Sequence, residues 1–542
     1  MKKELELPLG KRTGLYRFFE ILPGALSYFA VILLFLLSYF TPILAAIYLL
    51  LIISATLVKA IAVAFRTWQG FETMKKAERV DWRKRVKDLA TPHEAYERVR
   101  GTRSEAYGIE EHIKNLKRIS VAEKGKYPNP EKVYHAIIMV AYNEGLETLI
   151  PSIEAIREAD FPNERIIFVF GYEARGGEEM RKNAEEIKKK YKETFSKLII
   201  AEHPDGVKGE IKGKGPNLCF AAEKLSEYVR KKGIKSENVI VTSLDSDNRV
   251  SKGYLDYVLY EFITRENRQK VSYQPISLFT NNIWDAPAPM RVIAMSNSFY
   301  NVISTMRPHN LRNFASHSQP LEALEGMGYW SKRTIVEDGH QYWRSLFYFR
   351  GDYEVIPIRV PIYQDAVIGE TLLETLKAQF IQLRRWDYGA SDVAYVGVRL
   401  FDKKKRRGVP LVELVPKFIR LLDGHVTLAM MSPIVAFGGW VPAIMNLTAR
   451  GMAVFNLPRV VSVVQTIAVI GLFVTILTSL RLLPERPKKY KKVKGVMMVL
   501  QWILMPVIAL VYTSLAAYYS QTRLMIGKYM EKFDVTRKVV KK

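Results

Sequence analysis

The chain has 542 residues, with 81 Lys and Arg against 55 Asp and Glu, so its formal net charge is +26 at pH 7. A nucleic-acid partner is not indicated, because no helix-turn-helix, zinc-finger or RNP-type motif is present. The basic residues instead gather beside long apolar stretches, as expected for loops at an anionic membrane surface. The single cysteine, Cys219, excludes an intramolecular disulfide and a cysteine zinc cluster.

The N-terminal part of the sequence predicts a cytoplasmic tail, residues 1–21, and a membrane hairpin, residues 22–65. Two apolar runs meet at Thr41 and Pro42, and no small-residue cleavage pattern follows the first run. These features indicate a transmembrane hairpin rather than a cleaved signal peptide. Basic residues on both sides place its two ends in the cytoplasm. Residues 66–132 are polar and predict a solvated helical linker along the membrane.

From residue 133 onward, short apolar strands alternate with amphipathic helices. Strands are predicted at His135–Tyr142, Arg165–Tyr172 and Leu198–Ala201, and a central strand in the stretch Val239–Asn248, which ends in acidic residues. The alternation predicts an α/β domain over residues 133–372, with a Rossmann-like mixed sheet covered by helices on both faces. Its ligand site is expected at the carboxyl ends of the strands.

The C-terminal part of the sequence predicts a second membrane region, residues 418–526. Apolar stretches at about 418–447, 460–482 and 496–519 are each long enough to span a bilayer. A basic loop, 484–495, and a basic tail, 527–542, are expected in the cytoplasm. Five spans that start inside would leave the tail outside. We therefore expect a broken or re-entrant segment marked by one of three prolines, Pro433, Pro442 or Pro506.

Two carboxylates lie where the strand in the stretch Val239–Asn248 ends. Asp245 and Asp247 stand two apart at its carboxyl end. They can face a divalent cation whose other ligands are diphosphate oxygens, because hard cations prefer oxygen and keep positions for substrate. The alternative is an Asx turn, in which Asp245 or Asn248 bonds to its own backbone.

Three other loops carry polar residues that could meet a nucleotide. Asn143 and Glu144 follow the first strand, although Asn143 could simply cap the next helix. Glu173 follows the second strand, in what could be an ordinary turn. Lys214 lies in a glycine-rich turn, residues 213–217, where backbone N–H groups and a cation could bind phosphate.

An acidic pair, Glu337 and Asp338, starts a predicted helix. A carboxylate here can act as a general base toward a sugar hydroxyl. Asp338 with Gln341 also fits a capping box. We expect the neighbouring His340 to pack or form hydrogen bonds rather than bind metal, and His317 likewise.

The sequence QLRRW, Gln382–Trp386, lies in a predicted amphipathic interfacial region, residues 373–417. In a helix, Gln382, Arg385 and Trp386 share one face. These side chains suit a diphosphate and a sugar ring, because Arg offers paired donors to phosphate and Trp a flat apolar surface. An interfacial helix without a ligand is the alternative.

Taken in order, the motifs NEG at 143–145, KxG, DSD, VED and QLRRW, set between membrane segments, resemble the membrane-embedded family 2 glycosyltransferases, such as cellulose, hyaluronan and chitin synthases. The resemblance covers most of the chain, and the tail sequence FDVTRK, Phe533–Lys538, also resembles the ending of many such proteins. It implies a cytosolic GT-A domain at the plasma membrane. That domain would use Mg²⁺ or Mn²⁺ and transfer a sugar from a UDP-sugar to a growing polysaccharide, with inversion.

The resemblance also implies residue roles. The nucleotide sugar would contact Asn143, Glu144, Glu173, Lys214 and Asp245, and Asp247 with Asp245 would hold the metal. Asp338, beside Glu337, would be the base. The diphosphate and the acceptor end would be held by Gln382, Arg385 and Trp386. Glu173 stands where the family commonly has aspartate. VED replaces the more usual TED but keeps the acidic pair.

Two other functions fit the sequence. A transferase that places one sugar on a polyprenyl phosphate or another lipid would use the same motifs. A membrane scaffold or transporter would use the acids as caps and turns, but it would need intramembrane charges that the apolar segments largely lack. The sequence leaves the donor sugar, the acceptor and the oligomeric state open.

Overall fold

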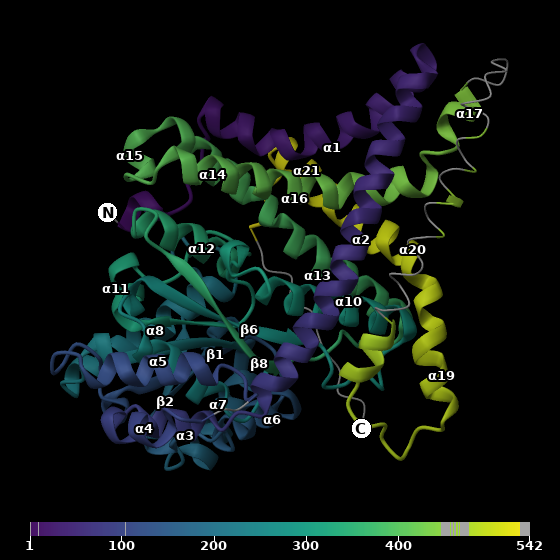
Figure 1. The fold of residues 1–542 in the computed structure, drawn as a ribbon. Helices are drawn as coiled ribbons and strands as arrows, with labels where there is room; N and C mark the ends of the chain where they lie inside the picture. Colours follow the sequence, from purple (N-terminus) through teal and green to yellow (C-terminus); the bar gives the residue numbers. More distant parts are fainter. Residues whose placement is uncertain are drawn as a thin grey trace.

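The computed structural model describes the chain except for Met1, Leu9, and residues 103–104, 446–455, 457–458, 460–461, 464–465, 467–475 and 532–542. An eight-stranded mixed sheet of order β3-β2-β1-β4-β7-β6-β8-β5 forms its centre (Figure 1). The strands are β1 (Tyr134–Ala141), β2 (Ile166–Glu173), β3 (Lys197–His203), β4 (Val239–Asp245), β5 (Arg249–Val250), β6 (Val271–Leu278), β7 (His317–Pro320) and β8 (Glu354–Tyr363). Helices cover both faces and apolar helices flank the domain, so the predicted fold class is confirmed.

The first four strands are parallel, and β7 pairs with β4 in the antiparallel direction. Alternate residues of β1 enter two separate cores, because successive side chains of a strand point to opposite faces. Ile137 and Met139 contribute to one core, and Ile138 and Val140 to the other. The first core is completed by α6 (Leu146–Arg157), α7 (Gly177–Tyr191) and α9 (Tyr254–Thr264), and the second by α8 (Lys214–Lys231), α11 (Leu321–Met327) and α12 (Glu337–Tyr348). Burial on both faces explains why these strands are almost continuously apolar.

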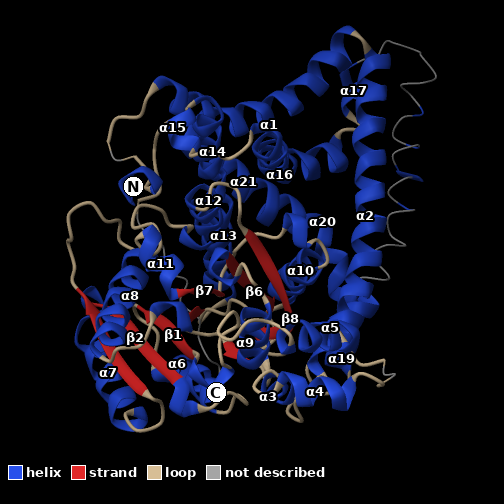
Figure 2. Cartoon of the chain, turned by 60° about the vertical axis from the view of Figure 1, so that its left-hand side comes forward, coloured by secondary structure: helices blue, strands red, loops and turns tan. Residues whose placement is uncertain are grey.

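The segment 66–132, expected to be a solvated linker along the membrane, packs on the sheet domain instead. It contains the end of α2 (Pro42–Glu78), then α3 (Trp82–Asp88), α4 (Pro92–Val99) and α5 (Ile109–Ser120). The Trp82 ring stacks on Tyr257 of α9, with centroids 3.6 Å apart and planes 9° apart. In Figures 1 and 2, α3 and α4 lie at the end of the domain far from α1 (Gly14–Phe40). A few large apolar side chains thus anchor a mostly charged segment.

Among the described residues, four helices are long and apolar enough to cross a membrane: Gly14–Phe40, Pro42–Glu78, Leu411–Phe437 and Val493–Met525. The first two are α1 and α2, which meet at Thr41 as the hairpin prediction requires. The third is α16, and the fourth contains α19 (Val493–Leu500), α20 (Met505–Ile508) and α21 (Leu515–Met525). Most of the predicted span at 460–482, and the tail sequence Phe533–Lys538, lie outside the described residues.

The prolines expected to mark a broken segment behave differently from one another. Helix α16 continues through Pro433 and ends at Phe437, and α17 (Val441–Met445), which contains Pro442, begins after a short break. Pro506 lies between a 3-10 turn and a π-helical turn, Ala509–Ser514. Regular helix geometry is therefore interrupted near Pro442 and Pro506.

Helices α1, α14 (Ser391–Phe401), α16 and α21 form a layer on one side of the sheet domain (Figure 1). The buried Phe19 ring of α1 packs at its centre, edge-on to Phe418 of α16 with centroids 5.6 Å apart. Gly397 of α14 permits this approach, because a Cβ there would lie 2.5 Å from the Phe19 ring.

The variant Gly397→Ala tests this packing. The added methyl group must displace the ring or the helix, and overpacking of this kind costs about 1–3 kcal/mol. We expect a lower Tm for the detergent-solubilised variant. The control is Gly424→Ala in α16, where a Cβ would meet nothing within 4 Å; its Tm should stay the same or rise slightly, because Ala favours helix. Equal Tm values for the two variants would contradict the described packing.

Candidate active site

The carboxyl ends of β1, β2 and β4 meet at one edge of the sheet, because these strands are parallel neighbours. In the sheet register, Val140 of β1 lies beside Asp245 of β4, and Glu173 of β2 lies beside His203 of β3. The predicted strand-end motifs therefore share the edge at which open α/β sheets bind ligands.

A buried lysine joins two of the predicted acidic motifs. The Lys214 Nζ atom, in the first turn of α8, lies 2.6 Å from Asp245 Oδ1 and 3.4 Å from Glu337 Oε1. Gly215 makes this approach possible, since a Cβ there would lie 2.4 Å from the carbonyl oxygen of Ser331 and 3.3 Å from Glu337 Cβ. Three segments far apart in the sequence thus converge on one ammonium group.

The charges in this cluster determine which groups hold protons. Burial alone would lower the pKa of Lys214, but Asp245, Glu337 and Asp338 together raise it, so the lysine stays charged. Burial raises the pKa of Glu337 to about 7, a shift that Lys214 opposes and Asp338 reinforces. Glu337 therefore keeps its proton up to about neutral pH.

Asp247 lies in a turn that other segments hold in place. Its Oδ2 atom accepts a hydrogen bond from the Asp365 backbone N–H at 3.2 Å, and Asn281 donates to its carbonyl oxygen at 3.2 Å. The Ser316 hydroxyl oxygen accepts from the Asp245 N–H at 3.1 Å and from Asn248 Nδ2 at 2.6 Å. The Asn248 side chain thus bonds across to Ser316, and the Asp245 carboxylate faces Lys214.

The Asp338 carboxylate is oriented by two backbone donors. Its Oδ1 accepts from the Gly339 N–H at 2.7 Å, and its Oδ2 accepts from the Ala315 N–H at 2.5 Å. Ala315 adopts φ of 48°, a left-handed conformation that is uncommon for a residue with a side chain. The bond to Asp338 is one of the contacts that hold it there.

The capping-box alternative is not what the structure shows. Gln341 is buried and donates to Gln319 Oε1 at 3.0 Å instead of closing the helix start.

The two histidines are buried and hydrogen-bonded, as expected: His317 with Ala315 O and Trp330, and His340 with Asp392. Burial lowers the pKa of His317 to about 4, so it is neutral at physiological pH.

The loops after β1 and β2 contain two residues that the sequence analysis did not select. The Arg175 guanidinium lies 4.2 Å from the centroid of the Tyr142 ring and forms an ion pair with Glu173. Glu144 Oε2 accepts from the N–H groups of Tyr142, at 2.7 Å, and Asn143, at 3.1 Å, so it closes its own loop. In the sequence, these two residues could have been found as an aromatic residue, Tyr142, and an arginine, Arg175, that each stand next to a strand end.

QLRRW lies near the end of α13 (Leu372–Asp387), whose start is fixed by a capping box of Thr371 and Glu374. Gln382 is buried and accepts from Gln379 at 3.1 Å. Arg385 is close enough to Glu337 to lower its pKa, which opposes the effect of burial. Trp386 remains 36% exposed, with its ring 6.1 Å from Phe279. The helix thus brings Arg385 toward the acidic pair.

No group of three or more His, Cys, Asp and Glu side chains is arranged to hold a metal ion in the part of the chain that the structure describes. Asp245 and Asp247 nevertheless offer hard oxygen donors at the strand end. Such a pair suits Mg²⁺ or Mn²⁺ if the other ligands come from a phosphate-bearing substrate and water.

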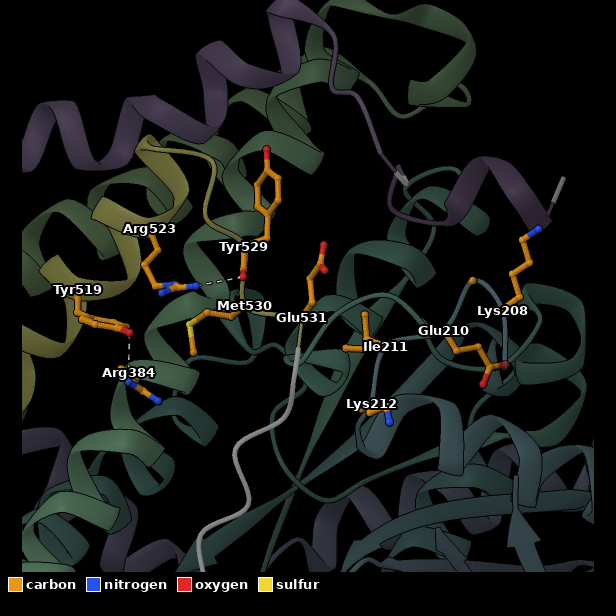
Figure 3. A pocket seen from close by; sticks show the side chains of 11 residues that line it. Lys208, Glu210, Ile211, Lys212, Arg384, Tyr519, Arg523, Tyr529, Met530 and Glu531 are labelled. Atoms are coloured by element: carbon orange, nitrogen blue, oxygen red, sulfur yellow. Dashed lines mark hydrogen bonds between the residues drawn. The ribbon is translucent and has the colours of Figure 1, made fainter. Parts of the chain in front are cut away.

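A cavity of about 710 Å³ lies between the loop 208–212, α13, α21 and residues 529–531. Figure 3 shows Arg384, Tyr519 and Arg523 on one side of it, with Lys208 and Lys212 on the other. The Arg384 Nη1 atom donates to the Tyr519 hydroxyl at 3.2 Å. Four cationic side chains, Lys208, Lys212, Arg384 and Arg523, and two acidic ones, Glu210 and Glu531, line this basic cavity. Local sequence patterns do not predict it, because it forms only where α13, α21 and the loop meet.

No family model and no curated protein matches the sequence. Among solved structures, a mannosyltransferase from Pyrobaculum calidifontis in complex with GDP-Man and Mn²⁺ is similar over 78% of this chain and 97% of its own, at 14% identity and a TM-score of 0.39. S. aureus TarS 1–349 in complex with UDP-GlcNAc is similar over 73% of this chain and 93% of its own, at 12% identity and a TM-score of 0.35. The fold class rests on the sheet and helices of this chain itself.

The raised pKa of Glu337 predicts a pH-dependent effect of Glu337→Gln. The folded protein binds this proton more tightly than the unfolded chain, whose Glu pKa is about 4.3. The contribution of this proton to the unfolding free energy of the wild type is therefore lost as pH rises from about 4 to about 7. The variant has no such proton and lacks this loss. Between pH 5 and pH 8, the variant should gain about 2–3 kcal/mol in unfolding free energy relative to the wild type.

Denaturant unfolding at the two pH values measures this difference. The matched control is Glu179→Gln, whose exposed side chain should give no pH-dependent difference from the wild type. If Glu337→Gln differs from the wild type by the same amount at pH 5 and pH 8, Glu337 does not hold its proton as described.

Proposed function

We propose that the chain is an integral-membrane, inverting glycosyltransferase with a GT-A domain, resembling family 2 enzymes. It moves a sugar from a nucleotide sugar, with a UDP-sugar as the expected donor, to a growing polysaccharide at the cytosolic face of the plasma membrane. The observation that carries this proposal is the convergence of Lys214, Asp245, Glu337 and Asp338 at the ligand-binding edge of the sheet. Helices able to cross a membrane adjoin this domain.

The donor would bind at the strand ends. Asp245 and Asp247 would hold Mg²⁺ or Mn²⁺, which supplies Lewis-acid stabilisation of the departing diphosphate when bound. Lys214 and Arg385 add positive charge on the side facing Glu337, and preformed charges of this kind stabilise a developing anion. The two loops that carry Asn143 and Glu144, after β1, and Glu173, after β2, would contact the nucleoside.

Asp338 would be the general base. Glu337 keeps its proton up to about neutral pH and faces Lys214, so the base role falls to the carboxylate beside it. Asp338 takes the proton of the acceptor hydroxyl, whose oxygen attacks the anomeric carbon while the bond from that carbon to the diphosphate oxygen breaks. Attack from the opposite face inverts the configuration in one step. Gln382 and Trp386 would hold the acceptor end.

The basic cavity favours a second acceptor, a polyprenyl phosphate or another lipid phosphate that receives one sugar. Lys208, Arg384 and Arg523 would suit a phosphate group, because charge-assisted hydrogen bonds to phosphate are strong. Tyr519 and Arg523 belong to α21, the end of the apolar helix Val493–Met525, so a lipid could approach along that helix. A scaffold or transporter has no comparable need for the buried Lys214 cluster.

The variant Asp338→Asn tests the base. Transfer should fall by about a hundred- to ten-thousand-fold, because the amide cannot accept the proton, while nucleotide binding stays measurable. Product formation from labelled donor gives the rate, and calorimetric titration gives the affinity. The control is Asp352→Asn, an exposed carboxylate paired with Lys270, which should transfer like the wild type. Full turnover by Asp338→Asn would remove this residue from the mechanism.

The variant Asp247→Ala tests the cation site. Nucleoside diphosphate affinity, measured with and without Mn²⁺, should lose its metal dependence, since one of two proposed ligands is gone. In the wild type, Mn²⁺ should tighten binding. An unchanged response to Mn²⁺ in the variant would show that the cation binds elsewhere.

A further inference from the structure

The first residues of the chain pack against α14 and against the segment that leads to the acidic pair Glu337 and Asp338. We call residues 4–8 the N-terminal strap. Leu5 is fully buried and Leu7 is 7% exposed, in the same core as Trp330 and Trp343. In Figures 1 and 2 the N-terminus lies near α12. The strap therefore contributes to the core behind the acidic pair.

Side chains from three other segments bind the backbone of the strap. Tyr395 Oη donates to Leu5 O at 3.0 Å, Arg399 Nη2 to Glu4 O at 2.9 Å, and Arg333 Nη1 to Leu7 O at 2.8 Å. Tyr395 and Arg399 belong to α14, which packs on α1, and Arg333 belongs to the segment that leads into Glu337. Arg344 Nη1 of α12 also donates to Leu5 O, at 3.3 Å. Four hydrogen bonds to the carbonyl groups of Glu4, Leu5 and Leu7 thus fix the register of the strap.

The Glu6 carboxylate connects the start of that segment, Ser331, to Arg344 of α12. Its Oε1 accepts from the Ser331 hydroxyl, and its Oε2 accepts from Arg344 Nη1 at 3.1 Å. Arg344 is 1% exposed and also donates to the carbonyl oxygens of Met327, at 3.0 Å, and Tyr329, at 3.3 Å. Because Glu6 is the carboxylate partner of this buried guanidinium, its removal would leave a buried charge without compensation.

The opposite side of the same segment contacts the Lys214 turn. The carbonyl oxygen of Ser331 would lie only 2.4 Å from a Cβ on Gly215, and the Ile211 N–H donates to Lys332 O at 3.0 Å. Ser331 is thus held between Glu6, through its hydroxyl, and the Lys214 turn, through its carbonyl. A shift of the strap would be passed to Lys214 and to the acidic pair.

We propose that Glu6 is a positioning residue for the transfer reaction. It holds segment 331–338 so that Glu337 meets Lys214 and Asp338 is aimed at the acceptor hydroxyl. The strap runs on in sequence to α1, a candidate membrane helix, so the same contacts tie that helix to the catalytic turn. This inference rests on the proposed function.

The variant Glu6→Gln tests the inference in the full-length protein. It keeps the size of the side chain and removes the charge that faces Arg344. We expect kcat to fall about 10- to 100-fold, as for a small misplacement of reacting groups, with nucleoside diphosphate affinity within about twofold of the wild type. The matched control is Glu4→Gln, the same change on a 62% exposed side chain 3.8 Å from Arg407, which should retain kcat.

Two further measurements separate positioning from a general loss of structure. Glu6→Asp, which keeps the charge, should recover part of kcat. In a double-mutant cycle, Ser331→Ala should lower kcat in the wild type but have little further effect in Glu6→Gln, because residues acting through one contact are not additive. Additive effects of the two changes, or unchanged kcat in Glu6→Gln, would overturn the proposal.

Amide hydrogen exchange provides a readout that does not need activity. Exchange of residues 331–339 should be faster in Glu6→Gln than in the wild type and in Glu4→Gln, because the segment loses its anchor. Unchanged exchange would overturn the inference about the strap. Failure of the wild type to transfer from any donor would instead overturn the proposed function, so the two failures are distinguishable.

Discussion

The candidate active site depends on one buried ion cluster, in which Lys214 lies between Asp245 and Glu337. A lysine with only 14% of its side chain exposed requires nearby negative charge to stay protonated, and Asp245, with Asp338 close by, provides it. The cluster also sets the geometry, because it draws the end of β4, the start of α8 and the start of α12 to one point. Two further carboxylates adjoin the cluster. Asp247 is held by Asn281 and Asp365, and Asp338 is held by Ala315 and Gly339.

The helices that are long and apolar enough to cross a membrane share contacts with the sheet domain and with α13. Helix α2 runs from the α1 end of the protein to the sheet, where it contacts α10 (Ala288–Thr305) and β8 (Figure 2). Helix α13 carries Arg385 toward Glu337 on one face, while Arg384 contacts Tyr519 of α21. The strap and α1 approach the same region from the N-terminus.

Local sequence patterns predicted much of this architecture, but not the contacts between distant segments. The four parallel strands were found because they are short and apolar, whereas β7, the polar run His317–Pro320, gives no such signal. The charged segment 66–132 was expected to be solvated because the packing of Trp82 on Tyr257 is invisible in its composition. Asp245 and Glu337 were recognisable from their motifs. The link through Lys214, the pairing of Tyr142 with Arg175, and the role of Glu6 required the folded chain.

The most direct test of the account is nucleoside diphosphate release by the wild-type protein in lipid nanodiscs. Radiolabelled UDP- and GDP-sugars would be supplied one at a time with Mn²⁺ or Mg²⁺ and membrane lipid. We expect metal-dependent release from one donor, with label recovered in a polymer or, for the second acceptor, in a lipid extract. Metal-dependent nucleotide binding without release or label transfer from any donor would contradict the claim that the Lys214 cluster is a glycosyltransferase site.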